Sequence, residues 1–269
     1  MDGKGERLDA YLVAMGAASG REKAKELIEA GFVAVNGATV TKASRRVADT
    51  DAVVCAAPAQ KYVGRGGYKL ERAIEAAGLT LTDAVAMDVG ASTGGFTDCM
   101  LQNGAARVYA VDVGHDQLHP TLRADARVVN LEGTDVRSEA LAAAVAQGSI
   151  TFCSVDVSFV SLSHVLPAML PYLAQDATLV CLIKPQFEAG KAAIGKHGVV
   201  KDRKVHAQVL SRQLCLFSEY GLTPVWLGHS PITGGEGNIE YLAVLRRDAD
   251  RVPVWDTAAV VQTAFETLK

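Results

Sequence analysis

The sequence is poor in aromatic residues and has no excess of basic charge. Only 6% of its 269 residues are Phe, Trp or Tyr, whereas 49% are hydrophobic. This balance favours helices packed closely on a sheet over an aromatic-rich β-sandwich. The chain has 27 Lys and Arg residues against 30 Asp and Glu residues, which gives a formal net charge of −3. Taken over the whole chain, this charge argues against an indiscriminate, polycationic nucleic-acid binder.

Long hydrophobic runs and paired cysteines are also missing. The longest uncharged stretch, residues 157–175, contains two prolines and a histidine, which indicates a loop and a buried helix instead of a membrane span. The first nine residues are polar, so we expect no signal peptide. The five cysteines are widely spaced and form no CxxC pair, which predicts reduced thiols and no metal site. We therefore expect a cytoplasmic protein with no membrane partner.

Residues 1–58 have the pattern of a small separate domain. Apolar residues at helical spacing predict one helix over 7–15 and a second, charged helix over 21–30. Asn36-Gly37 lies between two short apolar stretches and is a strong hairpin signal. Two helices followed by a small hairpin predict an α+β domain that buries little and leans on the rest of the chain.

This stretch resembles the small RNA-binding domain that is named after ribosomal protein S-four. The resemblance is carried by the RLD at 7–9, the helix at 21–30 and the GFVAVNG at 31–37. One departure is Gly20-Arg21, where the family usually has Ser-Arg, so the second helix lacks its usual capping hydroxyl. Without the resemblance, any small domain with a solvated charged helix would fit the pattern. The resemblance implies that the RNA-binding residues of this domain are Arg7, Arg21, Lys23, Lys42 and Arg45.

A linker at 59–66 leads to a larger domain at 67–269. In that domain an amphipathic helix at 67–78 precedes apolar strands that alternate with helical stretches. Repeated strand–helix units predict an α/β fold with a Rossmann-like, doubly wound sheet, mostly parallel, and we expect its last strand to be antiparallel. Ligands should then bind beyond the carboxyl ends of the strands. The predicted strands lie at 84–89, 107–111, 127–130, 150–155, 178–183, 222–227 and 239–245.

A glycine-rich turn follows the first of these strands. Residues 84–97 are AVAMDVGASTGGFT, in which the strand ends near Asp88 and Gly94-Gly95 open a helix. The G-x-x-x-G-G spacing differs from the G-x-G-x-x-G dinucleotide pattern, and no Gly-Lys-Ser/Thr of a phosphate loop follows. With an acidic residue two positions before its first glycine, the turn is typical of enzymes that use S-adenosylmethionine (SAM).

Acidic residues after the next two strands strengthen the SAM hypothesis. Asp112 can accept both hydroxyls of a ribose, and Asp135 can accept from an adenine amine. The alternative is an ordinary Rossmann turn with capping acids. The expected cofactor-binding residues are Asp88, Gly90, Ser92, Thr93, Gly94, Gly95, Phe96, Asp112, Asp135 and Asp156.

Four charged residues are predicted at the edge of the sheet where this cofactor would bind: Lys69, Asp156, Lys184 and Glu240. A lysine at the end of an apolar strand is costly unless it has partners or a function. A neutral lysine can take the proton of a ribose hydroxyl, and carboxylates can orient both groups. The fourth strand is not followed by Asn/Asp-Pro-Pro-aromatic, which argues against methylation of a base amine. We expect Lys184 to activate the hydroxyl, although each charge taken alone could be an ordinary surface residue.

Residues 64–247 resemble the FtsJ-like RNA 2′-O-methyltransferases, and the whole chain resembles the TlyA family, often labelled haemolysins. The matching stretches are GRGGYKLERA, DVGASTGGFTDC, VDVSFVSL, IKPQFEAG and GNIEY. The resemblance implies a catalytic tetrad of the four charged residues and methylation of cytidine 2′-oxygens in ribosomal RNA of one or both ribosomal subunits. A departure is EGTD at 132–135, where relatives often have Glu-Arg-Thr-Asn, so the expected adenine contact differs.

Local charge favours RNA more than the net charge does. Residues 61–72 carry four basic side chains and one acidic one, and residues 184–204 carry six basic and two acidic ones. Both stretches flank the predicted site, where Arg65 and its neighbours would contact phosphates. A non-catalytic RNA-binding or ribosome-assembly factor is the main alternative, and a membrane-active haemolysin is the least supported one. The sequence implies no obligatory protein partner.

Overall fold

The computed structural model describes residues 5–18, 20–56, 60–190, 193–247 and 253–268. They belong to two compact units, Met1–Lys61 and Tyr62–Lys269. The division falls inside the expected linker at 59–66, and Tyr62 is already part of the hydrophobic core of the second unit. Each unit is therefore described by itself.

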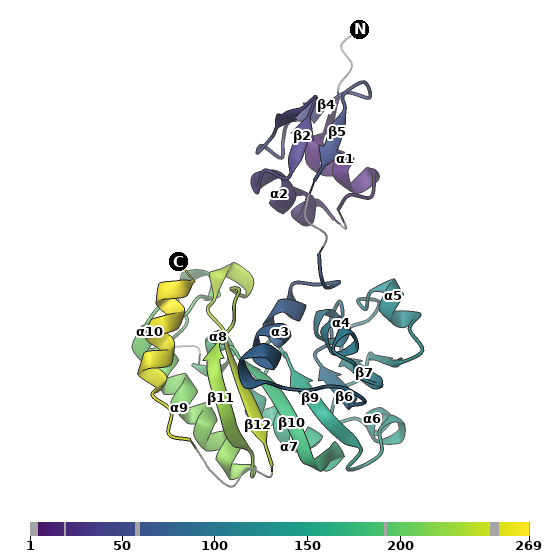
Figure 1. The fold of residues 1–269 in the computed structure, drawn as a ribbon. Helices are drawn as coiled ribbons and strands as arrows, with labels where there is room; N and C mark the ends of the chain where they lie inside the picture. The colour runs from purple at the N-terminus through teal and green to yellow at the C-terminus, as the bar shows by residue number, and fades with distance from the viewer. Residues whose placement is uncertain (1–4, 19, 57–59, 191–192, 248–252, 269) are drawn as a thin grey trace. The chain divides into compact units, whose positions relative to one another are not determined.

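The first unit contains the two predicted helices and the hairpin (Figure 1). Leu8, Leu12 and Ile28 from the helices pack on Val33 and Val35, and all five are fully buried. The hairpin turns at Asn36-Gly37, where both residues have positive φ, as a two-residue hairpin loop requires. The elements are β1 (Glu6–Arg7), α1 (Leu8–Ala14), α2 (Arg21–Glu29), β2 (Val33–Val35), β3 (Ala38–Thr39), β4 (Arg46–Val47) and β5 (Val53–Cys55).

These short strands form two sheets. β2 pairs with β3 and β5 on either side, and β1 pairs with β4, all antiparallel. The pair of β1 and β4 was not predicted, because strands of two residues are too short to show a period of two.

The second unit is built on a seven-stranded sheet with the order β11-β12-β10-β9-β6-β7-β8. β12 runs antiparallel to both of its neighbours, and the other strand pairs are parallel. The mostly parallel sheet with an antiparallel last strand confirms the predicted fold class. The strands are β6 (Val85–Val89), β7 (Arg107–Asp112), β8 (Val128–Glu132), β9 (Ile150–Val155), β10 (Leu173–Ile183), β11 (Thr223–His229) and β12 (Tyr241–Arg246).

Helices cover both faces of this sheet, which explains why its strands are mostly apolar (Figure 1). On β6, Ala86 packs toward α3, α4 and α5, whereas Met87 and Val89 pack toward α6, α7, α9 and α10. The polar residues discussed below lie at the carboxyl ends of β6 and β7 and directly after β9 and β10. The helices are α3 (Gly66–Ala77), α4 (Gly95–Gln102), α5 (Pro120–Arg123), α6 (Glu139–Ala144), α7 (Leu162–Met169), α8 (Pro185–Glu188), α9 (Arg203–Glu219) and α10 (Thr257–Thr267).

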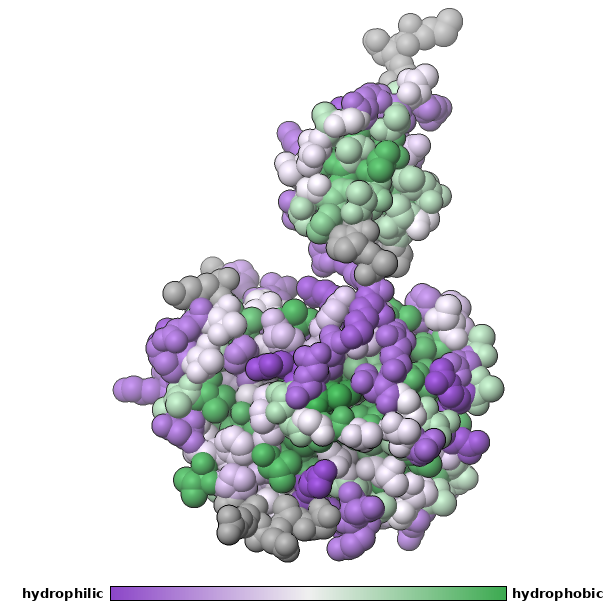
Figure 2. Space-filling model, viewed as in Figure 1, coloured by the Kyte–Doolittle hydropathy of each residue, from purple (hydrophilic) through white to green (hydrophobic). Residues whose placement is uncertain are grey.

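Among the described residues, no helix is long and apolar enough to cross a bilayer. On the face of the second unit that Figure 2 shows, hydrophilic and hydrophobic residues are interspersed.

Candidate active site

Two adjoining cavities open at the carboxyl ends of the central strands. The first has a volume of about 800 Å³ and is lined by α3, the turn after β6 and the segments that follow β9 and β10. The second, of about 470 Å³, is lined by the segments after β6, β7, β8 and β9. A ligand with two chemically different ends could therefore span both cavities. The residues that line both are Gly90, Ser92, Asp156, Ser158 and Phe159.

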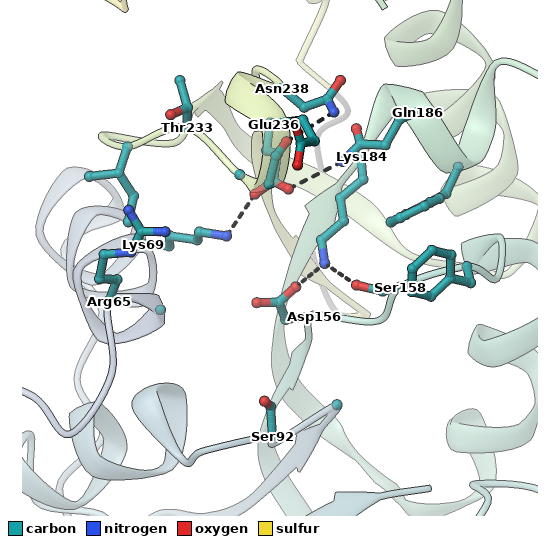
Figure 3. A pocket seen from close by; sticks show the side chains of 18 of the residues that line it. Arg65, Lys69, Ser92, Asp156, Ser158, Lys184, Gln186, Thr233, Glu236 and Asn238 are labelled. Atoms are coloured by element: carbon teal, nitrogen blue, oxygen red, sulfur yellow. Dashed lines mark hydrogen bonds and ion pairs between the residues drawn. The ribbon is translucent and has the colours of Figure 1, made fainter. Parts of the chain in front are cut away.

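Lys184 and Asp156 form an ion pair where the two cavities meet (Figure 3). Lys184 directly follows β10 and is 7% exposed, and its Nζ lies 2.6 Å from Asp156 Oδ1. The same amine donates a hydrogen bond of 2.9 Å to Ser158 Oγ. Parallel neighbours β9 and β10 end at the same edge of the sheet, which is why these three residues meet.

Lys69, labelled in Figure 3, forms a second ion pair with Glu240 on the wall of the first cavity. Lys69 comes from α3 and Glu240 directly precedes β12, and their Nζ and Oε2 atoms lie 2.6 Å apart. Glu240 is 2% exposed, and its other oxygen accepts from Gln186 Nε2 at 3.4 Å. A Cβ atom at Gly234 would lie 2.1 Å from Glu240 Oε1, so a glycine is needed there to make room for the carboxylate. The structure thus brings all four predicted catalytic residues to one cavity.

The glycine-rich turn packs directly against the segment that carries Asp156. Gly90 has φ +86°, and a Cβ there would lie 2.3 Å from the backbone oxygen of Asp156. Gly94 has φ +95° and leaves room for Leu122. Both positions therefore require glycine for conformation and for space. Of the other predicted turn residues, the first cavity is lined by Ser92, Thr93, Gly95 and Phe96.

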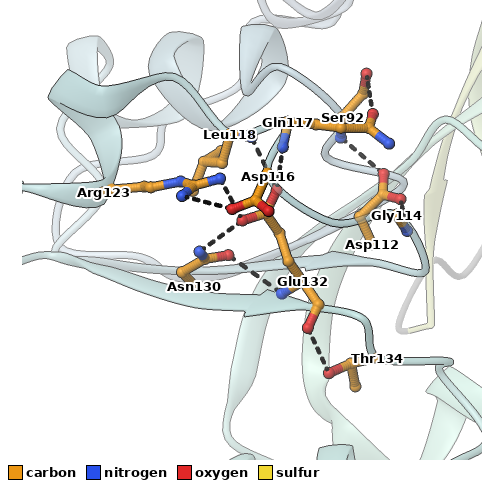
Figure 4. A network of polar contacts seen from close by, with 10 residues as sticks. All are labelled: Ser92, Asp112, Gly114, Asp116, Gln117, Leu118, Arg123, Asn130, Glu132 and Thr134. Atoms are coloured by element: carbon orange, nitrogen blue, oxygen red, sulfur yellow. Dashed lines mark hydrogen bonds and ion pairs between the residues drawn. The ribbon is translucent and has the colours of Figure 1, made fainter.

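Asp112 lines the second cavity at the end of β7. Its two carboxylate oxygens accept from the backbone N–H groups of Ser92 and Gly114, at 2.8 and 2.7 Å (Figure 4). Each oxygen keeps lone pairs for a further donor. The loop beside it is held by Glu132, which accepts from the backbone N–H groups of Gln117 and Leu118 and pairs with Arg123 at 2.9 Å. The carboxylate on the cavity wall is therefore fixed in position before any ligand arrives.

Asp88 and Asp135, two other acidic residues predicted to bind the cofactor, have surroundings different from those of Asp112. Asp88 is completely buried, lines neither cavity, and accepts hydrogen bonds of 2.7 Å from Thr97 and Ser154. Burial raises the pKa of Asp88 to about 6, against the opposing effect of these hydrogen bonds. Asp135 lines the second cavity, and hydrogen bonds from Arg137 lower its pKa to about 2.

The predicted RNA-binding residues fall in both units. In the first unit, Arg7 and Arg21 both donate to the buried carboxylate of Asp9, and the hydrogen bond from Arg7 is the main cause that lowers its pKa to about 2. Lys23 pairs with Glu26, and Lys42 and Arg45 are exposed. Arg65 belongs to the second unit and lines the first cavity. The described residues contain no group of three or more His, Cys, Asp or Glu side chains that could hold a metal ion.

Sequence reasoning missed three residues of this site. Ser158 and Gln186 are partners of the predicted tetrad, as described above. Phe159 is 91% exposed with φ +64°, lines both cavities, and lies 5.0 Å from the ring of Phe187 between centroids. An exposed aromatic residue in the left-handed region is a strained feature, which is typical of functional sites. The only signal in the sequence was its place inside the VDVSFVSL stretch.

Comparisons with known proteins show the families and the fold that this chain shares. Residues 62–247 match the model of the FtsJ-like methyltransferases, and residues 6–53 match the S4 domain. The 16S/23S rRNA (cytidine-2′-O)-methyltransferase TlyA of Mycobacterium tuberculosis is 41% identical over 246 residues, covering 91% of each chain. YqxC of Bacillus subtilis, described as a candidate rRNA methyltransferase, is 43% identical and covers 100% of this chain and 97% of its own. A solved structure from Streptococcus thermophilus, described as a candidate hemolysin, has a TM-score of 0.76 and 39% identity and covers 97% of this chain and 96% of its own.

Proposed function

The chain belongs to the FtsJ-like methyltransferase family, and from that premise we propose that it transfers a methyl group from SAM to a cytidine ribose 2′-hydroxyl of ribosomal RNA. The observation that carries this proposal is the ion pair of Lys184 and Asp156 at the junction of the two cavities. It provides a positioned nitrogen base beside the place where a cofactor and a substrate would meet. Names of relatives supply the substrate class: TlyA of M. tuberculosis is described as an rRNA (cytidine-2′-O)-methyltransferase.

The residues around the second cavity suit the nucleoside end of SAM. Asp112 offers carboxylate lone pairs to ribose hydroxyls, and the exposed Val113 and the neighbouring Val136 offer apolar contact to an adenine ring. The glycine-rich turn at Gly90 and Gly94 leads from there into the first cavity, which would take the amino-acid end. When bound, SAM supplies a methyl group on a sulfonium: the ribose oxygen bonds to the methyl carbon while the carbon–sulfur bond breaks and its electrons stay on sulfur.

Lys184, in its neutral amine form, would accept the proton that the ribose hydroxyl loses. Proton transfer to a positioned side chain is the usual way to activate a weak oxygen nucleophile. Asp156 lies 2.6 Å away and stabilises the charged lysine that this transfer creates. Lys69 and Glu240 line the same cavity and would orient the ribose without taking the proton.

The first unit and the rim of the site would hold the RNA. The exposed guanidinium groups of Arg7 and Arg21 and the side chains of Lys42 and Arg45 suit phosphates. At the site, Phe159 presents an exposed ring on which an unstacked base can rest. Ribosomal subunits as the partner imply that the protein works in the cytoplasm.

The test is to incubate the protein with methyl-labelled SAM and separated, unmodified small and large ribosomal subunits. We expect label in the RNA of at least one subunit and none in subunits incubated without protein. Binding of RNA without any incorporated label would instead support a non-catalytic assembly factor. Lysis of membranes by the protein in the absence of SAM would support a haemolysin.

A further inference from the structure

Residues 156–161 form the segment that joins β9 to α7, and they include Asp156, Ser158 and Phe159. The start of this segment is fixed by the backbone N–H of Asp156, which donates to the backbone oxygen of Val89 at 2.9 Å. In its middle, Phe159 has φ +64° and is 91% exposed. A residue other than glycine keeps such a strained conformation only where its surroundings hold it there. We therefore looked for a second anchor at the far end of the segment.

Glu188 is this second anchor. Its Oε1 accepts from the backbone N–H of Leu162 at 2.9 Å, and its Oε2 accepts from Ser161 Oγ at 2.7 Å and from Gln213 Nε2 at 2.9 Å. Leu162 is the first residue of α7, so the carboxylate satisfies one of the backbone N–H groups that a helix leaves free at its start. Glu188 is half-buried and lines neither cavity. It can therefore influence a ligand only through the segment that it holds.

The same two stretches of chain also meet at the reaction centre. Lys184 directly precedes α8, and its Nζ lies 2.6 Å from Asp156 Oδ1 and donates to Ser158 Oγ at 2.9 Å (Figure 3). Glu188 is the last residue of α8, which is only four residues long. One short helix thus carries the amine at its start and the anchor of the 156–161 segment at its end. Because so little chain separates the two contacts, the anchor limits how far Asp156 can move from Lys184.

We propose that Glu188 is a positioning residue for methyl transfer, which holds the 156–161 segment so that Asp156 and Ser158 stay beside Lys184. This inference rests on the proposed function. The hydrogen bonds of Glu188 carry this role and not its charge, because its three donors are a hydroxyl, an amide and a backbone N–H. Glu188 itself neither gains nor loses a proton in the reaction.

Two replacements of Glu188 separate its hydrogen bonds from its charge. Glu188→Ala removes all three hydrogen bonds. Glu188→Gln keeps an oxygen for the N–H of Leu162, and its amide can donate to Ser161 Oγ and to Gln213 Oε1, a buried atom that has no hydrogen-bond partner among the described residues. Ser161→Ala removes one of the three hydrogen bonds and is a milder variant if Glu188→Ala does not fold.

Asp256→Ala is the matched control for stability. Asp256 is also a carboxylate at the start of a helix, where it accepts from the backbone N–H of Ala259 at 3.0 Å, and it lines neither cavity. Loss of a helix cap should lower the melting temperature by a few degrees, as should Glu188→Ala. The control therefore shows what a loss of stability alone does to methyl transfer.

The measurements are kcat for unmodified ribosomal subunits, the melting temperature, and hydrogen exchange of residues 156–162 by mass spectrometry without substrate. Both SAM and the subunits must be saturating, because the 156–161 segment lines both cavities and its release would also weaken binding. Hydrogen exchange reports on the anchor whether or not methyl transfer is observed.

We expect Glu188→Ala to lower kcat about tenfold or more, since small misplacements of reacting groups are costly. Exchange should become faster at residues 156–162 and stay unchanged in β9. Ser161→Ala should change both quantities in the same direction by less. Glu188→Gln should keep most of kcat, and Asp256→Ala should keep all of it.

Three outcomes overturn the inference alone while the parent chain is active: full kcat in Glu188→Ala, unchanged exchange at residues 156–162 in that variant, or a Glu188→Gln variant as impaired as Glu188→Ala. If Glu188→Ala does not fold, parental kcat and exchange in Ser161→Ala overturn it instead. An equal loss of kcat in Asp256→Ala also overturns it, because the loss would then follow stability alone. A parent chain that transfers no methyl group to either subunit overturns the proposed function, and the inference falls with it.

Discussion

The two lysine–carboxylate pairs of the site have the same separation and different surroundings. Both nitrogen–oxygen distances are 2.6 Å. The side chain of Asp156 is 18% exposed and touches both cavities, whereas that of Glu240 is 3% exposed, lines only the first and fills the space left by Gly234. Distance alone therefore does not distinguish them. What distinguishes them is which cavity each carboxylate touches and how far it is buried.

We infer from this difference that one pair carries the chemistry and the other the architecture of the site. The two lysines are buried to a similar degree, but the carboxylate of Asp156 reaches the junction of the two cavities, where its pair could exchange a proton with a substrate. The pair of Lys69 and Glu240 would mainly hold α3 against the start of β12, because breaking it would leave a charge in the interior without a partner. The following predictions test this division.

Replacement of Lys184 by alanine should have the largest effect. A positioned general base contributes roughly 100-fold to 10,000-fold to a rate, so we expect the single-turnover rate of methyl transfer to fall about 1,000-fold. The Kd of SAM, measured by calorimetry, should change little because the lysine does not line the second cavity, where the nucleoside end would bind. Near-normal turnover of this variant would remove Lys184 from the chemistry.

Glu240→Ala and Asp156→Ala should separate the two pairs by stability. Without Glu240, the ammonium of Lys69 stays buried and uncompensated, which should lower the free energy of unfolding by about 3 kcal/mol or more. Asp156→Ala should cost less, because the amine of Lys184 still donates to Ser158 Oγ when the carboxylate is gone. Urea denaturation monitored by circular dichroism gives both values. Equal losses would mean that this remaining partner does not distinguish the pairs.

Asp88 is a buried carboxylate that has no lysine partner among the described residues, so it can be compared with the two lysine–carboxylate pairs. Its pKa of about 6 in the folded chain lies above the unfolded value near 4, so between these two pH values the folded state holds a proton that the unfolded state has lost. Stability should therefore fall as pH rises from about 4 to about 6, by on the order of 2 kcal/mol. Asp88→Asn keeps a side chain that can hydrogen-bond and should flatten this part of the profile. The check is the free energy of unfolding at a series of pH values, and an unchanged slope in the variant would contradict the assignment.

Gly234→Ala should disturb only the Lys69–Glu240 pair. Its new Cβ would lie 2.1 Å from Glu240 Oε1 and force the carboxylate to move, so we expect kcat to fall roughly tenfold with the Kd of SAM unchanged. Gly235→Ala is the matched control, because no atom lies within 4 Å of the Cβ it would add. If both variants behave alike, the effect comes from the loop and not from Glu240.

Periodicity and motif spacing were enough to predict the sheet, the antiparallel last strand and the meeting of Lys69, Asp156, Lys184 and Glu240. Asp156 and Lys184 directly follow strands, Glu240 precedes one, and Lys69 lies on the helix before the first strand of the sheet, so the order of the elements constrains all four. Which individual side chains contact one another could not be predicted from periodicity and motif spacing. Thr97 and Ser154 donate hydrogen bonds to the buried Asp88, and Arg137 donates to Asp135. These contacts depend on side-chain rotamers and packing, which leave no periodic pattern in the sequence.

The most direct test of the division between the pairs is the single-turnover rate of Lys184→Arg beside that of Lys69→Arg, with SAM and ribosomal RNA saturating. Arginine keeps the positive charge and pairs with a carboxylate, but it does not lose its proton and so cannot serve as the base. We expect Lys184→Arg to lose at least about 100-fold in rate, whereas Lys69→Arg should stay within about tenfold of the parent chain. Equal rates for the two variants, or a faster Lys184→Arg, would contradict it.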